Sequence, residues 1–124
     1  MRKTIVIDGK QVEIKANART MLRYKEWLNR DMIKDFYKAV KPYQEAYARA
    51  AEAGEDVLVD VSGEVIEILQ SMAWVMARQA DSSVPTNLGD WLDQFDSFDV
   101  EAVGKEIVDF WFATVKTSVT PKNV

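Results

Sequence analysis

Hydrophobic and polar positions alternate near the N-terminus of the chain. Residues 4–7 and 11–15 are rich in β-branched side chains, and Asp8-Gly9 lies between them. An Asp-Gly pair favours a tight hairpin turn because both residues tolerate a positive φ. We therefore predict a two-stranded β-hairpin over residues 3–16. Because a lone hairpin is marginally stable in water, its apolar side chains must pack on helices or on a neighbouring subunit's strands. These side chains are Ile5, Ile7, Val12 and Ile14.

From Asn17 onward, apolar residues recur every three or four positions, which is the spacing of an amphipathic helix. A first helix is predicted to end near Asn29, with Asn17 or Thr20 as its N-terminal cap. Asp31 opens a second helix, and the apolar phase of this helix continues across Pro42. One kinked helix ending at Gly54 is therefore favoured over two helices joined by a loop. Its predicted apolar stripe is Met32, Phe36, Val40, Tyr43, Tyr47 and Ala50.

A third helix, ending at residues 80–81, has the broadest apolar surface, so we expect it to form the centre of the core. Asp60 or Ser62 is predicted to cap it, and residues 57–61 fit either an extended segment or the entrance of this helix. Its apolar positions are Val65, Ile66, Ile68, Leu69, Met72, Ala73, Val75, Met76 and Ala77.

Two further helices complete the pattern. Asn87 is predicted to cap a short helix, with Asp90 returning the cap, and a last helix begins at about Asp99. Residues 117–124 show no periodicity and are predicted to form a flexible C-terminal tail. The expected fold class is α+β, predominantly α: an N-terminal hairpin followed by about five helices around one core, in a single domain over residues 1–116. The apolar positions of the two helices are Leu88, Trp91, Leu92 and Phe95, then Val100, Val103, Ile107, Trp111 and Val115.

The amino-acid composition limits the kinds of catalytic and metal sites that the chain can form. The 124 residues are 48% hydrophobic, which suffices for one core without metals or crosslinks, and they include no cysteine and no histidine. The chain therefore lacks thiolate nucleophiles, the side chain that titrates near neutrality, and the commonest metal ligand. We expect that the protein is not an enzyme, and we expect no catalytic residue, no cofactor and no metal site.

The N-terminal residues do not resemble a targeting signal. Residues 1–8 contain only three consecutive apolar residues before an acid, far short of a signal-peptide core. No stretch approaches the roughly 18 apolar residues of a membrane span. We therefore expect the protein to remain in the cytoplasm where it is made, without membrane contact.

Charge is unevenly distributed along the chain. Residues 1–41 carry 11 Lys or Arg against 5 Asp or Glu, whereas residues 42–124 carry 5 against 15. We interpret the charged residues of both parts as solvated faces of helices. The functional alternative is that the opposite charges steer a partner or support homo-oligomerisation. The basic part, interleaved with Tyr24, Trp27 and Tyr37, is also the candidate surface for a small nucleic-acid-binding regulator. The acidic remainder and a pI near 4.9 argue against nucleic acid as a partner.

A series of aspartates and a triplet of aromatic residues are two candidate functional features of the sequence. Asp90, Asp93, Asp96 and Asp99 recur every three residues, but they lack the spacing and glycine of a calcium loop, which favours helix caps and a solvated face. Phe110 and Phe112 flank Trp111, and successive helical residues are about 100° apart, so the two phenylalanines face nearly opposite directions. One of them either packs on a second side of the monomer or contacts a partner. The candidate partner-binding residues are Trp91, Phe95, Phe110 and Phe112.

Several stretches resemble the tail assembly chaperones of long-tailed, siphovirus-type bacteriophages and prophages of Gram-positive bacteria. The first part is Lys-Thr-Ile-Val-Ile-Asp-Gly-Lys-Gln-Val at residues 3–12, with Thr20, Tyr24 and Arg-Asp-Met-Ile-Lys-Asp at residues 30–35. The second part is Trp-Val-Met-Ala-Arg-Gln-Ala-Asp at residues 74–81, with Asp-Trp-Leu-Asp-Gln-Phe at residues 90–95 and Trp111. These are patterns of common residues and contain no chemical motif.

The resemblance implies a non-enzymatic protein of the infected host's cytoplasm that is absent from the mature virion. It would bind the tape measure protein in many copies and help recruit tail tube protein. The family commonly makes a longer form by ribosomal frameshifting, which here would add an extension after about Val115. Two other functions stay open from the sequence: the nucleic-acid-binding regulator, and a virion tail-completion or connector component.

Overall fold

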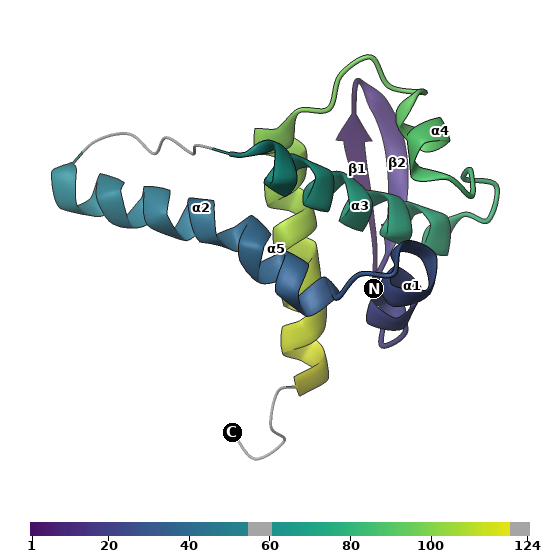
Figure 1. The fold of residues 1–124 in the computed structure, drawn as a ribbon, viewed down its shortest axis with the longest axis horizontal. Helices are drawn as coiled ribbons and strands as arrows, with labels where there is room; N and C mark the ends of the chain where they lie inside the picture. Colours follow the sequence, from purple (N-terminus) through teal and green to yellow (C-terminus); the bar gives the residue numbers. More distant parts are fainter. Residues whose placement is uncertain (55–60, 120–124) are drawn as a thin grey trace.

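The computed structural model describes residues 1–54 and 61–119, with side chains up to Val115. A two-stranded hairpin is followed by five helices, which confirms the predicted α+β, predominantly helical class (Figure 1). The elements are β1 (Arg2–Ile7), β2 (Lys10–Lys15), α1 (Thr20–Leu28), α2 (Met32–Ala53), α3 (Gly63–Ala80), α4 (Leu88–Leu92) and α5 (Val100–Val119).

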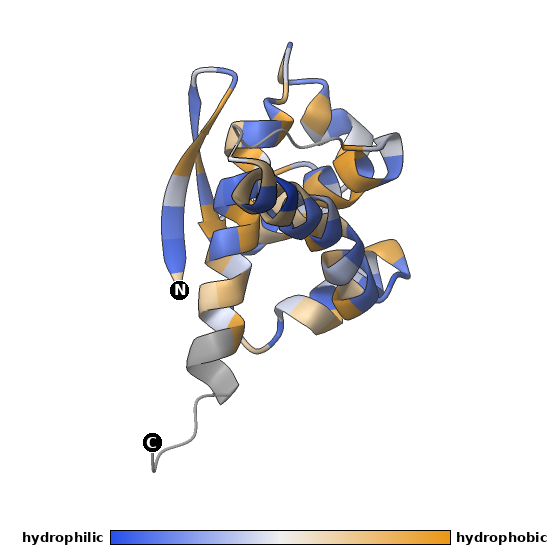
Figure 2. Cartoon of the chain, turned by 90° about the vertical axis from the view of Figure 1, so that its left-hand side faces the viewer, coloured by the Kyte–Doolittle hydropathy of each residue, from blue (hydrophilic) through white to orange (hydrophobic). Residues whose placement is uncertain are grey.

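The hairpin forms as its sequence pattern predicts. Asp8 and Gly9 both have positive φ values, 52° and 73°, and Ile5 pairs with Val12 in the antiparallel register. Because opposite residues in this register share a face, Ile5, Ile7 and Ile14 lie together and are buried, whereas Val6 is exposed. That face packs on helices of the same chain: β2 contacts α3 and β1 contacts α5 (Figure 2).

Helix α3 is the centre of the core, as its broad apolar surface predicts. Every residue from Ser71 to Ala77 is buried, and α3 contacts β2, α1, α2, α4 and α5. Ser62 is the N-terminal cap, because its hydroxyl accepts a hydrogen bond from the Val65 amide at 3.3 Å. Residues 55–60, which include the alternative cap Asp60, lie outside the described residues.

Helix α2 continues through Pro42 and ends at Gly54, whose φ is 67°. Its buried positions are Met32, Asp35, Ala39 and Ala46. Of the predicted apolar stripe, Met32 is buried, Phe36 and Val40 are half-buried and Tyr47 is exposed. The predicted stripe therefore coincides only in part with the buried face of α2. Helix α3 contacts the flank that carries the small Ala39 and Ala46, since small side chains permit close helix approach. The C-terminal half of α2 points away from the rest of the described fold (Figure 1).

Two predictions about helix ends are also wrong. Arg19 occupies the N-cap position of α1, and its side chain makes no cap. The Asn17 side chain accepts from the Arg19 amide at 2.9 Å, just before the helix, and the Thr20 hydroxyl accepts from the Asn17 amide at 2.9 Å. Residues 117–119, assigned to the tail, belong to α5. Residues 120–124 lie outside the described part of the chain.

The hairpin turn is tied to the connection between α4 and α5. The Asp8 carboxylate accepts hydrogen bonds from the Asp96 amide at 2.9 Å and the Ser97 hydroxyl at 3.0 Å, and these bonds lower the pKa of Asp8. Lys10 donates to the Gln94 carbonyl and lies 5.5 Å from the centre of the Phe95 ring. These contacts position the start of α5.

No described helix combines the length and apolar character needed to cross a lipid bilayer.

Gly104 lets α5 approach its neighbours. A Cβ atom built there would lie 2.8 Å from Leu69 Cδ1 and 3.0 Å from the Tyr43 hydroxyl. Alanine favours a helix over glycine by about 1 kcal/mol, but overpacking a core costs about 1–3 kcal/mol. Because Leu69 is fully buried, any shift of its side chain disturbs the packing around it, so overpacking should win. We expect Gly104→Ala to lower the free energy of unfolding by about 1 kcal/mol in urea denaturation.

Gly63→Ala is the matched control for this substitution. Gly63 is also helical, and a Cβ atom there meets nothing within 4 Å. Its alanine variant should be neutral or slightly stabilising. A Gly104→Ala protein at least as stable as the Gly63→Ala protein would contradict the close approach of α5.

Candidate protein-binding groove

An apolar groove lies where α2 crosses α5 (Figure 1). Its volume is about 340 Å³. Both helices pack on α3, and neither packs extensively on the other, so the side chains between them are left partly uncovered. The lining consists of Ile33, Phe36, Tyr37, Val40 and Gln44 on α2, and Val108, Asp109, Trp111, Phe112 and Val115 on α5.

Large apolar side chains in this groove face solvent. Tyr37 is 69% exposed, Phe112 59% and Ile33 40%. Phe36 and Tyr37 meet edge to face, with ring centres 6.2 Å apart. Scattered apolar residues on a surface are normal, whereas a contiguous group that lines a concave site is typical of an interaction surface. We call this group of residues on α2 and α5 the α2–α5 groove.

The groove continues along α2 toward its C-terminus. A smaller cavity of about 150 Å³ shares Val108 and Asp109 with it and adds Tyr43, Tyr47 and Lys105. Tyr43 is held in place because its hydroxyl donates to the Val100 carbonyl at 3.4 Å, and Tyr47 is 53% exposed. Since Ile33 and Tyr47 are fourteen residues apart on one helix, the apolar strip is about 21 Å long. That length matches about four turns of a partner helix.

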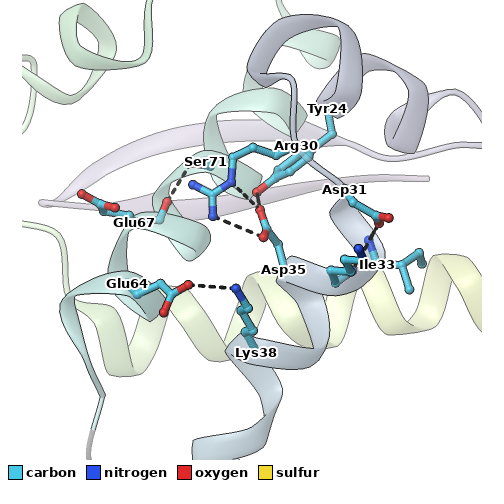
Figure 3. Close-up of polar contacts among 10 residues, drawn as sticks. Tyr24, Arg30, Asp31, Ile33, Asp35, Lys38, Glu64, Glu67 and Ser71 are labelled. Carbon is cyan, nitrogen blue, oxygen red and sulfur yellow. Dashed lines mark hydrogen bonds and ion pairs between the residues drawn. The ribbon is translucent and has the colours of Figure 1, made fainter.

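A buried ionic network sets the position of α2 and therefore of the groove (Figure 3). Asp35 is 5% exposed, and its carboxylate accepts a hydrogen bond from the Tyr24 hydroxyl at 2.6 Å and forms an ion pair with Arg30 Nε at 2.8 Å. A second Arg30 nitrogen, Nη2, reaches the other carboxylate oxygen at 3.2 Å, so the pair is bidentate. The network joins α1, the α1–α2 connection and the first turn of α2.

Tyr24 is the neutral member of this network. Burial first, and then the hydrogen bond to Asp35 and the charge of its carboxylate, raise the pKa of Tyr24 well above its ordinary value. The phenol therefore stays protonated and donates to Asp35 across the physiological pH range.

Two further contacts hold the start of α2. Asp31 caps α2 by accepting from the Ile33 and Lys34 amides, and Lys38 pairs with Glu64 of α3 at 3.0 Å (Figure 3).

Trp111 contributes a buried donor beside the groove. The residue is 3% exposed, and its indole N–H has no hydrogen-bond acceptor among the described residues. An unsatisfied buried donor costs roughly 1–3 kcal/mol, so most such groups in folded proteins have a partner. Trp111 thus differs from Trp74, whose indole N–H donates to the Pro85 carbonyl at 2.9 Å.

The structure distributes the four sequence candidates over three environments. Phe112 lies in the groove and is exposed, whereas Phe110 is in the core, as their opposite helical directions predict. Trp91 is 2% exposed and packs edge to face on Phe95 at 5.1 Å, and Phe95 is half-buried beneath Lys10. Trp91 and Phe110 therefore offer almost no surface to a partner.

Sequence reasoning missed the α2 side of the groove. The sequence places Phe36 and Val40 on the apolar stripe of α2 and Tyr37 on the candidate nucleic-acid surface, and it gives Ile33 no role, although α2 carries more apolar residues than one contact can bury. The acidic series forms no cation site: within residues 1–54 and 61–119, no group of three or more acidic side chains is placed to hold a metal ion. Asp99 instead caps α5 by accepting from the Ala102 amide at 3.1 Å.

Comparisons with known proteins give no assignment. No protein-family model matches the chain, and neither a curated protein nor a solved structure is significantly similar to it. The geometry of the α2–α5 groove is therefore the observation from which a function can be proposed.

Proposed function

We propose that this protein is a phage tail assembly chaperone that holds the tape measure protein through the α2–α5 groove. The observation that carries the proposal is the strip of exposed aromatic and aliphatic side chains between α2 and α5, which includes Tyr37 and Phe112. The sequence resemblance to tail assembly chaperones supplies the identity of the client. The protein acts by binding and carries out no covalent chemistry.

An amphipathic helix is the client shape that this groove accommodates. Such helices place apolar anchors at i, i+3, i+4 and i+7, which present one apolar stripe to a concave surface. The strip on α2, from Ile33 to Tyr47, is long enough for several of these anchors. Long coiled or helical clients satisfy this requirement.

The partly buried state of the groove suits reversible holding. Phe36, Val40 and Val108 are already half-buried, so binding removes only part of their surface from water. Part of the free energy gained by burying the exposed rings is offset by the freedom that the partners lose on association. Many weak contacts along one client would then keep it soluble and still release it when tail tube protein assembles around it.

The direct test is co-expression with the tape measure protein of the same phage or prophage. We expect the client to stay in the soluble fraction and to be recovered with the tagged chaperone, because its apolar helical segments are covered. Client aggregation that is unchanged by the chaperone would refute the proposal. Mass spectrometry of purified virions should find the tape measure protein but not this polypeptide.

A further inference from the structure

A second cavity of about 340 Å³ has the opposite chemical character to the α2–α5 groove. It lies among the end of β2, the start of α1 and the end of α3. Four of its lining side chains are cations, Lys15, Arg19, Arg23 and Arg78, and no carboxylate lines it. A concave site lined by one sign of charge concentrates the field and attracts counter-ions. We call it the basic pocket.

The cations of the basic pocket are poorly neutralised. Lys15 and Arg19 form no ion pair with any residue in the described ranges. Arg23 reaches Glu26 only at 4.0 Å, and the Arg78 guanidinium donates to the neutral carbonyl of Val84 at 2.8 Å. Elsewhere on the chain, cations such as Arg30 and Lys38 have close carboxylate partners. The pocket therefore carries an excess positive charge that an anion would offset.

One wall of the pocket is held by a hydrogen-bond network. The hydroxyl of Thr20, which is fully buried, donates to Gln79 Oε1 at 2.7 Å, and Gln79 Nε2 donates to Asn17 Oδ1 at 3.4 Å. Asn17 Oδ1 also accepts from the Arg19 amide at 2.9 Å. This network joins the start of α1 to the end of α3, so the backbone that carries Arg19 and Arg78 is positioned before any ligand arrives.

Trp27 restricts what the ligand can be. Arg23 and Arg78 lie 5.2 Å and 5.3 Å from the centre of its ring, and Trp74 packs against it at 5.7 Å. Because Arg23, Arg78 and Trp74 lie beside the half-buried indole, they compete with a nucleobase for stacking on it. Both guanidinium groups line the same pocket, and their planar donors suit the oxygens of phosphate. The pocket therefore recognises a ligand by its negative charge and by the geometry of its oxygen atoms.

The charge of the pocket selects among oxyanions, and the volume of the pocket is about 340 Å³. Four cations exceed the charge of about −1.5 to −2 on one phosphate group at neutral pH. We infer that the basic pocket binds a small anion of the linked-phosphate class, in which two or more phosphates share the four cations.

Isothermal titration of the whole chain with sodium pyrophosphate at low ionic strength tests this site. We expect saturable binding to the wild-type protein and weaker binding of orthophosphate. A variant with both Lys15→Gln and Arg19→Gln should bind pyrophosphate at least tenfold more weakly, because these two cations have no other partner in the described structure. Lys25→Gln is the matched control, since Lys25 is an exposed cation of α1 outside the pocket, and it should bind like the wild type.

The outcome does not depend on the proposed chaperone activity, because the pocket and the groove share no lining residue. Absence of saturable binding, or equal affinity in the double variant and the control, would overturn the inference. Tighter binding of a short single-stranded oligonucleotide or of a glutamate-rich peptide, without displacement by pyrophosphate, would also overturn it. If the double variant is less stable than the wild type, the single Arg19→Gln variant, at an exposed position, must still show the weaker binding.

Discussion

A protein with Tyr37→Ser and Phe112→Ser should lose most of its ability to keep the tape measure protein soluble. Both side chains lie in the α2–α5 groove and are largely exposed, at 69% and 59%. Burying an aromatic side chain at an interface contributes about 1.5–3 kcal/mol, so losing two should reduce client affinity at least tenfold. The client recovered in the soluble fraction and in pulldown measures the effect.

The fold of this double variant should be nearly unchanged, because exposed side chains contribute little to folding stability. Leu22→Ser is the matched control: Leu22 is 52% exposed on α1, outside the groove, and its replacement should leave client recovery intact. Full client recovery with the double variant would show that the client binds elsewhere. Equal loss with the Leu22 variant would mean that general surface hydrophobicity, rather than the groove, holds the client.

Asp35→Ala should be the most destabilising single substitution considered for this chain. It would leave the Arg30 guanidinium and the Tyr24 hydroxyl without their acceptor at the base of α2 (Figure 3). Breaking a buried ion pair costs about 3–5 kcal/mol. Since the Arg30 side chain is 34% exposed and water can reach it, we expect the lower end, about 3 kcal/mol, in the free energy of unfolding from urea denaturation.

A double-mutant cycle assigns this loss to the network. In the wild-type background, Tyr24→Phe removes the hydrogen bond to Asp35 and should lower the free energy of unfolding. In the Asp35→Ala background, the same substitution should lower the free energy of unfolding clearly less. Additive effects of the two substitutions would contradict coupling between Tyr24 and Asp35. A loss below about 1 kcal/mol for Asp35→Ala would mean that the network does not hold α2 in place.

Local chemistry explains why many elements were predictable. The Asp8-Gly9 turn, the caps at Asp31 and Asn87, and the end of α2 at Gly54 all depend on residues within a few positions of each other. Hydrogen bonds of this kind form within one turn of chain, so their residue types are visible in the sequence. The N-cap of α1 was predicted wrongly: Arg19 holds that position, the Asn17 side chain accepts from the Arg19 amide, and Thr20 bonds to Gln79, fifty-nine residues away.

The candidate sites needed distant segments and were only partly predictable. The aromatic triplet correctly indicated that Phe110 and Phe112 face opposite ways, but the α2 side of the groove depends on where α3 and α5 meet α2. The basic pocket likewise brings Arg78 of α3 to Arg19 and Arg23 at the start of the chain. Nothing in the spacing of these residues predicts that they meet.

The order of the hairpin and helices, most of their ends and the central place of α3 follow from the local pattern of residues, because period and capping are local properties of the chain. Which face of α2 is buried, and which side chains meet in the groove and the basic pocket, depends on how distant segments pack. An amphipathic helix specifies an apolar surface but not the partner that covers it. Packing selected the flank with Ala39 and Ala46 and left Tyr37, with Phe112 of α5, facing solvent.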